Sequence, residues 1–328
     1  MMTNNHSDAK IIFWGTSEFA IPSLETLIEH GYRIAAVVTN PDALSGRKRI
    51  LTPPAVKKQI VKSARPIEIL QPEDLTAIRR TLLAINPDLY IVAAYGKILP
   101  KAILDIPKYG ALNIHPSFLP RWRGPAPIQY TILNGDAETG VTIIKMDEEM
   151  DHGPILAQRE LGISKLQITN YKPMYTELHN NLADLGAELI IDVLPKWIRG
   201  EIAPVPQDES KATYSKILTK ANGRINWTKP AEEIERMIRA FNPWPGSWTI
   251  WTVKSQPLRL RIEQADLYEA GPHRGPKGAV SRDKKGAMVV VCGRGNLEIK
   301  KLTPEGSKAM SAGEFLHGRP DFIGAVLV

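Results

Sequence analysis

The first half of the chain alternates short apolar runs with segments of helical spacing, and this alternation limits the folds that it can form. The apolar runs cover residues 10–14, 32–39 and 88–94, and the helical patterns fall near 17–29, 53–62 and 73–85. Strands that alternate with helices favour a parallel sheet with helices on both faces. We therefore predict an α/β fold with a mostly parallel sheet for the N-terminal part.

The chain has 328 residues, which is more than one typical domain needs. A polar stretch that contains Pro204 and Pro206 breaks the alternating pattern. Short β-like runs with glycine-bearing connections follow it, and they indicate a small barrel or sandwich. We predict a first domain over residues 1–203, a linker over 204–210 and a second domain over 211–328.

Positive charge is concentrated in the C-terminal third of the chain. Residues 211–328 carry 20 Lys and Arg against 11 Asp and Glu, a net +9, whereas residues 1–210 carry 22 against 24, a net −2. This asymmetry suggests a polyanionic partner for the C-terminal part. A solvated basic surface that only aids solubility is the alternative.

Two features bear on the cellular location. The polar first ten residues lack the apolar stretch of a secretory signal, and no run of about 18 apolar residues follows. The single cysteine, Cys292, cannot form an internal disulfide, which fits a reducing compartment. We expect a cytoplasmic protein without a membrane partner.

Two polar residues at the end of a predicted strand are the strongest candidates for catalysis. Asn113 and His115 are two residues apart, so their side chains point to the same face of the strand. Pro116 and Pro120 stiffen the loop that follows. Such a loop lies where open α/β sheets bind ligands. Asp151 is a candidate only as the partner of His115, because alone it is equally typical of a turn.

Other chemistries fit these residues less well. Zinc sites draw on closely spaced Cys and His, whereas this chain has one cysteine and no His-x-x-x-His pattern, so we predict no metal. A triad of Ser117, His115 and Asp151 lacks the G-x-S-x-G elbow of a hydrolase. The turn after the first strand, at Gly15, lacks the later glycines of a dinucleotide fingerprint. It indicates a tight turn, or an anion site at a helix N-terminus, and not NAD binding.

A long loop after the second apolar run carries three consecutive cations, Arg47, Lys48 and Arg49. Such a loop can reach a phosphate backbone and would make binding sensitive to salt; a solvated surface loop is the alternative. Two further arginines share a predicted helical face beside an aromatic cluster: Arg236 and Arg239, with Phe241, Trp244, Trp248 and Trp251. Aromatic residues at this density form a core more often than a platform for stacked bases.

The central motif resembles the folate-dependent formyltransferases. It reads Asn113-x-His115-Pro-Ser-Phe-Leu-Pro, with Asp151 downstream. Similarity extends to the opening Phe-Trp-Gly-Thr-Ser-Glu-Phe-Ala, to Arg-Trp-Arg-Gly-Pro-Ala-Pro-Ile-Gln after the motif, and to Phe-Asn-Pro-Trp-Pro-Gly and Glu-Phe-Leu-His-Gly near the end. The resemblance covers nearly the whole chain. The chain differs at Phe118, where the family commonly has Leu, and in the basic loop, which lacks a second glycine.

The resemblance implies a Rossmann-like catalytic domain followed by a smaller, OB-like β-barrel that binds tRNA. It implies 10-formyltetrahydrofolate as the formyl donor, and methionyl-initiator tRNA as the acceptor, because the C-terminal match separates this chain from relatives that act on glycinamide ribonucleotide or amino sugars. We expect a monomer. Asn113 and a protonated His115 would stabilise the oxyanion, and Asp151 would orient the imidazolium and relay protons.

The resemblance further implies two binding surfaces. The residues expected around the folate are Ser117, Phe118, Leu119, Pro120, Gly124, Ile91 and Tyr95, and those expected to contact tRNA are Arg47, Lys48 and Arg49. Two rival interpretations keep the same residues. The chain could formylate a nucleotide-linked amino sugar, or it could be an RNA-binding protein with an inert formyltransferase-like domain; an assay of formyl transfer separates them.

Overall fold

The computed structural model describes residues 9–46, 49–63, 65–162, 172–271 and 273–328, and these form two compact units. The first unit comprises residues 1–127, 137–171 and 178–216. The second comprises 128–136, 172–177 and 217–328. A short helix, α5 (Pro127–Asn134), falls almost wholly in the second unit, although it lies within the predicted first domain. The predicted domain boundaries stay a prediction.

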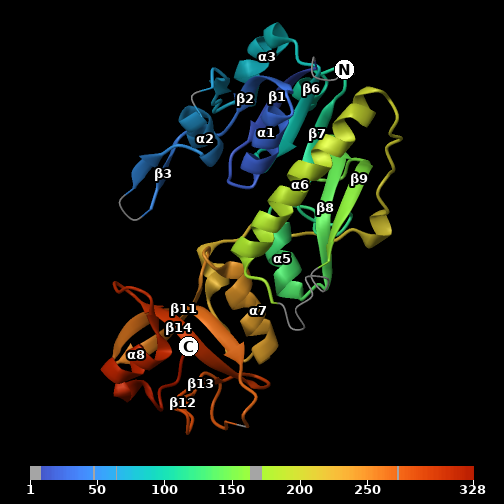
Figure 1. The fold of residues 1–328 in the computed structure, drawn as a ribbon. Helices are drawn as coiled ribbons and strands as arrows, with labels where there is room; N and C mark the ends of the chain where they lie inside the picture. Colours follow the sequence, from blue (N-terminus) through green and yellow to red (C-terminus); the bar gives the residue numbers. More distant parts are fainter. Residues whose placement is uncertain (1–8, 47–48, 64, 163–171, 272) are drawn as a thin grey trace. The chain divides into compact units, whose positions relative to one another are not determined.

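A seven-stranded sheet forms the centre of the first unit, in the order β5-β2-β1-β6-β7-β8-β9 (Figure 1). Its strands are β1 (Lys10–Gly15), β2 (Arg33–Val38), β5 (Glu68–Leu70), β6 (Leu89–Ala93), β7 (Ala111–His115), β8 (Glu138–Lys145) and β9 (Ile155–Gly162). The first five in this order are parallel, whereas β8 and β9 are antiparallel to their neighbours. The predicted mostly parallel sheet is confirmed.

Helices connect the parallel strands, as the alternating pattern predicts. They are α1 (Ala20–Glu29), α2 (Ala55–Ser63), the 3-10 turn η1 (Leu75–Ile78), α3 (Arg79–Ile85) and α4 (Lys101–Leu104). The long helix α6 (Tyr175–Ile198) comes after the last strand of the sheet. Helix α6 continues through Pro195 for three further residues. Gly186 of α6 faces Ile114, where a Cβ would lie 2.7 Å from the Ile114 methyl group, so the absence of a side chain lets the helix approach the sheet closely.

One face of the sheet is built around aromatic rings. Trp14 at the end of β1 packs edge to face against Tyr90 and Tyr95, with both pairs of ring centroids 5.2 Å apart. Leu82 of α3 and Ile103 of α4 complete this apolar cluster. The aromatic core fixes the ends of β1 and β6, beside which β7 delivers its polar residues.

The basic loop is a β-hairpin. Strands β3 (Ala43–Ser45) and β4 (Ile50–Thr52) pair antiparallel, and Gly46 and Arg49 at the tip both have positive φ. Arg47 and Lys48 lie outside the described residues. At its base, Lys57 pairs with Asp42 at 2.8 Å. The ion pair thus holds the base of the hairpin against helix α2.

The second unit contains a curled antiparallel sheet, in the order β10-β11-β14-β13-β12, that forms half of a barrel (Figure 1). Its strands are β10 (Ser247–Val253), β11 (Gln256–Leu267), β12 (Val280–Arg282), β13 (Met288–Val291) and β14 (Asn296–Pro304), and β15 (Met310–Ser311) pairs with β14. Helices α7 (Ala231–Phe241) and α8 (Ala312–Gly318) bury apolar residues against it, and the 3-10 turns of this unit are η3 (Lys220–Gly223) and η4 (Pro320–Phe322). The turn η2 (Glu209–Lys211) belongs to the first unit. The curled antiparallel sheet confirms the predicted β-structure of the C-terminal part, as a half-barrel with helices packed against it.

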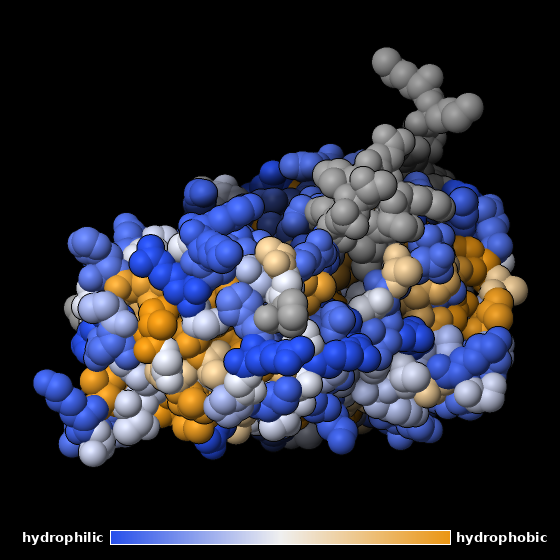
Figure 2. Space-filling view, turned by 90° about the horizontal axis from the view of Figure 1, so that it is seen from below, coloured by the Kyte–Doolittle hydropathy of each residue, from blue (hydrophilic) through white to orange (hydrophobic). Residues whose placement is uncertain are grey.

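The surface is mixed in polarity. Figure 2 shows hydrophilic side chains with apolar patches between them on the face that it presents. In the part of the chain that the structure describes, no helix combines the length and the apolar character that crossing a bilayer requires.

Candidate active site

Strand β7 brings the two predicted donors to its carboxyl end. Asn113 and His115 lie on one face of the strand, and both are buried, with 9% and 4% of their surfaces exposed. Ile114 between them points to the opposite face, towards α6. The apolar residue in the middle anchors the strand, while its polar neighbours are held rigidly at the edge of the sheet.

The carboxylate of Asp151 joins these two side chains. Its Oδ1 accepts a hydrogen bond from Nδ2 of Asn113 at 3.1 Å and lies 3.5 Å from Nδ1 of His115. Its Oδ2 accepts a hydrogen bond from the backbone N–H of Gly124 at 2.8 Å. The structure therefore brings the predicted amide, imidazole and carboxylate together at one point.

Oxygen atoms face both nitrogens of the His115 ring. Nε2 donates to the carbonyl oxygen of Trp122 at 3.0 Å, and Nδ1 faces Asp151. Trp122 has a positive φ of 60°, and this turn aims its carbonyl at the ring. The carbonyl and the carboxylate thus fix the ring plane from two sides.

A glutamine that sequence analysis missed holds the backbone of Asp151. Nε2 of Gln207 donates to the carbonyl oxygens of Asp151, His152 and Gly153, at 2.8, 3.0 and 2.8 Å. Gln207 lies in the predicted linker, but this stretch packs within the first unit, where Val205 also pairs with Ile155. A proline-rich composition alone carries no signal for such contacts.

The loop after His115 is held by hydrogen bonds from the neighbouring strands. Thr142 of β8 donates its hydroxyl hydrogen to the Ser117 carbonyl at 2.7 Å and accepts from the Leu119 N–H at 3.1 Å. The side chains of Ser117 and Leu119 are buried, whereas Phe118 is 40% exposed. Of the predicted folate loop, Phe118 therefore offers an open apolar surface, with Pro120 half-buried beside it.

Other predicted folate residues lie elsewhere. Ile91 pairs in register with Leu112, so its side chain is on the face of the sheet opposite Asn113 and His115. The ring of Tyr95 is buried in the aromatic core, and burial raises its pKa to about 12. The N–H of Gly124 is bonded to Asp151. Folate contacts by these residues stay a prediction.

The candidate residues for binding tRNA are only partly described. Arg49 at the hairpin tip is exposed. In the second unit, the guanidinium of Arg259 lies 3.9 Å from the ring centroid of the half-buried Trp248, and Arg224 lies 5.9 Å from it. Arg239, by contrast, forms an ion pair with the buried Glu235 at 2.6 Å. Of the aromatic residues in the predicted cluster, Trp244 is 50% exposed and Trp248 is half-buried, whereas Phe241 and Trp251 are buried.

Charged groups also surround the Asp151 turn. The ring of His152 donates a hydrogen bond to the Asp147 carboxylate, which raises the pKa of His152, and the nearby carboxylates of Glu149 and Glu209 act in the same direction. Hydrogen bonding to Arg123 lowers the pKa of Glu209. Among the described residues, no group of three or more His, Cys, Asp and Glu side chains is arranged to hold a metal ion.

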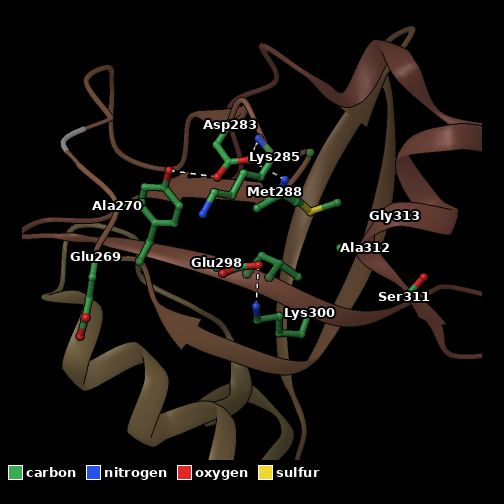
Figure 3. Close-up of a pocket in the computed structure, with 14 residues that line it drawn as sticks. Glu269, Ala270, Asp283, Lys285, Met288, Glu298, Lys300, Ser311, Ala312 and Gly313 are labelled. Carbon is green, nitrogen blue, oxygen red and sulfur yellow. Dashed lines mark hydrogen bonds and ion pairs between the residues drawn. The ribbon is translucent and has the colours of Figure 1, made fainter.

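An open pocket of about 540 Å³ lies in the second unit (Figure 3). The hydroxyl of Tyr268 donates to Asp283 at 3.1 Å, and Lys300 pairs with Glu298 at 2.5 Å. None of the predicted site residues lines this pocket. We assign this pocket no function.

Two family profiles match the chain. The profile described as formyl transferase covers residues 9–194, and the one described as formyl transferase, C-terminal domain, covers residues 217–320. Similar curated proteins are the methionyl-tRNA formyltransferases of Chloroflexus aurantiacus, 43% identical over 94% of this chain and 96% of that protein, and of Marinobacter nauticus, 42% identical over the same shares.

Solved structures share the fold at low identity. HypX from Aquifex aeolicus has a TM-score of 0.64 and 19% identity over 97% of this chain, which spans about half of HypX at 48%. An N-formyltransferase from Helicobacter canadensis, in complex with folinic acid and dTDP-3-aminofucose, has a TM-score of 0.63 and 16% identity, over 92% of this chain and 100% of that one. Together with the profiles and the curated relatives, these findings show that the chain belongs to the methionyl-tRNA formyltransferase family.

Proposed function

We propose that this protein transfers the formyl group of 10-formyltetrahydrofolate to the α-amine of methionyl-initiator tRNA. The observation that carries the proposal is the meeting of Asn113, His115 and Asp151 at the end of β7, with both donors within 3.5 Å of one carboxylate oxygen. The similarity of nearly the whole chain to methionyl-tRNA formyltransferases supports the choice of substrates. Formylation of the initiator serves the start of translation.

The donor groups suit a reaction in which negative charge develops on the formyl oxygen. The Asn113 amide carries a second N–H besides the one bonded to Asp151, and we propose that it donates to this oxygen. His115, held by the Trp122 carbonyl and by Asp151, would add positive charge beside it. Hydrogen-bond donors accelerate the step when they bind the oxyanion of the transition state more tightly than the carbonyl oxygen of the substrate.

The bonds and the proton balance as follows. The amine nitrogen forms a bond to the formyl carbon, and the bond from that carbon to N10 of the folate breaks. The amine loses one proton, which ends on N10. We propose that Asp151 relays this proton through water, since its carboxylate is the base beside the two donors.

The folate would lie beside Phe118, whose exposed ring provides an apolar surface next to the donors. The adjoining Gly140 has no side chain, and a Cβ there would lie 2.9 Å from the Phe118 ring. The tRNA would be bound by the hairpin tip at residues 47–49 and by the basic surface of the second unit, where Arg259 covers Trp248. We further propose a cytoplasmic monomer, because initiator tRNA is charged and used in that compartment.

The test is formylation of charged initiator tRNA by the purified protein, with and without 10-formyltetrahydrofolate. We expect formylmethionyl-tRNA only when the folate is present. A parallel reaction offers a dTDP-linked amino sugar as acceptor. Formylation of the sugar and not of the tRNA would favour the amino-sugar interpretation, and formylation of neither would favour an inert RNA-binding protein.

A further inference from the structure

We propose that Gln207 is a positioning residue that holds Asp151 in its working conformation, and that Arg123 and Glu209 hold Gln207 in turn. The inference rests on the proposed role of Asp151 in formyl transfer. It concerns the side chains of Gln207, Arg123 and Glu209, which act through the backbone of the Asp151 turn.

The Asp151 turn has a backbone that needs support. Asp151 has a positive φ of 52°, which is uncommon for a residue other than glycine and costs energy unless the surroundings hold it. The turn is also tightly packed, because a Cβ on Gly153 would lie 1.9 Å from the Lys145 carbonyl oxygen. A small shift here would move the carboxylate relative to His115.

The side-chain amide of Gln207 lies at the centre of this turn. Its Nε2 donates to three successive carbonyl oxygens, those of Asp151, His152 and Gly153, all within 3.0 Å. Three successive carbonyls can meet one donor only when the backbone curls around it. The hydrogen bonds therefore select the observed conformation of the turn, whereas the bonds from Asn113 and Gly124 hold only the side chain of Asp151.

The other end of the amide is fixed by Arg123. Oε1 of Gln207 accepts hydrogen bonds from Nε and Nη2 of Arg123, at 3.0 and 2.8 Å. The guanidinium of Arg123 has only hydrogen-bond donors, so the side-chain oxygen of Gln207 must face it. The side-chain nitrogen of Gln207 then faces the three carbonyl oxygens of the turn. Arg123 is 2% exposed, and its buried charge is balanced by both carboxylate oxygens of Glu209, at 2.6 and 3.0 Å.

The backbone on both sides of this cluster is also bound. Val205 exchanges two backbone hydrogen bonds with Ile155, and the N–H of Ser215 donates to the Arg123 carbonyl at 2.7 Å. Gln207 is thus carried by a segment that is tied at both ends to the first unit. A rigid carrier is what a positioning residue needs.

The test compares two substitutions of Gln207, each made in the wild-type protein and in the Asp151→Asn variant. Gln207→Met removes the hydrogen bonds at similar volume, and Gln207→Glu keeps the contact with Arg123 but turns an oxygen towards the carbonyls. We expect each to lower kcat by about tenfold to a hundredfold, since misplacement of a reacting group by about 1 Å costs this much. KM for the folate and for the tRNA should stay within about twofold, because Gln207 acts through Asp151.

The decisive readout is the dependence on Asp151. In the Asp151→Asn background, the same Gln207 substitutions should cost less than about threefold, because two changes that act through one carboxylate are not additive. An equal loss in both backgrounds, or an unchanged kcat in the wild-type background, would overturn the inference. Ser210→Ala is the matched control on the same segment, because its hydroxyl bonds only to Asp208 among the described contacts, and it should keep wild-type kcat.

Two further measurements keep the outcome interpretable. Thermal unfolding checks that each variant is folded. If both Gln207 variants fail to fold, Glu209→Gln provides a milder test, since Glu209 is 56% exposed, and it should lower kcat in the same Asp151-dependent way. If the wild-type protein transfers no formyl group, both the proposed function and this inference are wrong. If the wild type is active and the Gln207 variants are fully active, only this inference is wrong.

Discussion

Oδ1 of Asp151 lies 3.5 Å from Nδ1 of His115, although the two residues come from different segments of the chain and both side chains are largely buried. Water screens charges weakly at such a site, so a carboxylate there acts strongly on the ring. The same oxygen accepts a hydrogen bond from Asn113. One carboxylate therefore orients the Asn113 amide, which we propose as the oxyanion donor, and the His115 ring beside it.

Replacing Asp151 by Asn should stop most of the turnover without preventing folate binding. The substitution keeps the size of the side chain and removes its charge and its capacity to accept a proton. We expect kcat to fall on the order of a hundredfold to ten-thousandfold, as for the loss of a general base. Steady-state kinetics and direct titration of the folate measure the two effects, and normal turnover would refute the role of Asp151.

Asn113→Ala removes one proposed oxyanion donor. Such a loss typically raises the activation free energy by about 2.7–4 kcal/mol, so kcat should fall on the order of a hundredfold to a thousandfold. Asn134→Ala is the matched control, since that residue is exposed and its amide bonds to Asp136. A fall in kcat of less than about threefold in Asn113→Ala would show that the Asn113 amide does not donate a hydrogen bond to the oxyanion in the transition state.

Reversing the charges of Arg47, Lys48 and Arg49 to Glu should weaken tRNA binding and spare folate binding. Each lost phosphate contact should reduce the slope of log affinity against log salt by about one. The single reversal Arg49→Glu and the control Arg80→Glu, on the exposed side of α3, change the net charge equally, and only Arg49→Glu should weaken tRNA binding. Unchanged affinity for methionyl-tRNA at physiological salt would remove the hairpin from the tRNA-binding surface.

The stability of the Asp151 turn should depend on pH through His152. The hydrogen bond that His152 donates to Asp147 raises the pKa of His152 in the folded protein, so the folded state binds the proton more tightly than the unfolded state does. This contribution is complete below the unfolded pKa and disappears as pH rises through the folded pKa. His152→Gln should therefore lower the free energy of unfolding more at about pH 5.5 than at about pH 8.

Urea unfolding at the two pH values measures this difference. Asp147→Asn removes the main cause of the pKa shift, and in that background the effect of His152→Gln should depend less on pH. An effect of His152→Gln that grows as pH rises would contradict the assignment.

Local patterns predicted the parallel sheet and the pairing of Asn113 with His115. The alternation of strands and helices has few packed solutions, and the two-residue spacing on a strand decides which side chains share a face. A motif does not say which way each loop residue turns. The structure shows that the side chains of Ser117, Leu119 and Tyr95 are buried, which the motif alone does not indicate, and their contact with the folate stays a prediction.

Long-range contacts with the backbone leave no pattern in the sequence. Gln207 lies 56 residues from Asp151, and its side chain binds carbonyl oxygens that any residue would provide. The proline-rich stretch around it predicted a linker, because prolines mark breaks in secondary structure whether or not the segment packs. Arg123 was noticed within a motif, but only the fold shows that it supports Gln207.

Gly124→Ala should reduce both stability and turnover, because this glycine has two structural roles. Its φ is +106°, and a Cβ would lie 2.6 Å from the carbonyl oxygen of Ser215, so the backbone must shift. Its N–H is the donor to Oδ2 of Asp151, and the shift would carry this donor away from the carboxylate. We expect a loss of more than about 1 kcal/mol in the free energy of unfolding, the usual scale of backbone strain, with a fall in kcat.

Gly31→Ala separates these two effects. Gly31 also has a positive φ, of +78°, but a Cβ there meets nothing within 4 Å. The control should therefore show a cost of about 1 kcal/mol from backbone strain alone, with wild-type kcat. If Gly124→Ala kept wild-type kcat while losing stability as Gly31→Ala does, the bond from Gly124 would have no part in orienting Asp151. A fall in kcat confined to Gly124→Ala would instead show that the loop at residues 121–124 and the Asp151 turn together hold the Asp151 carboxylate in place.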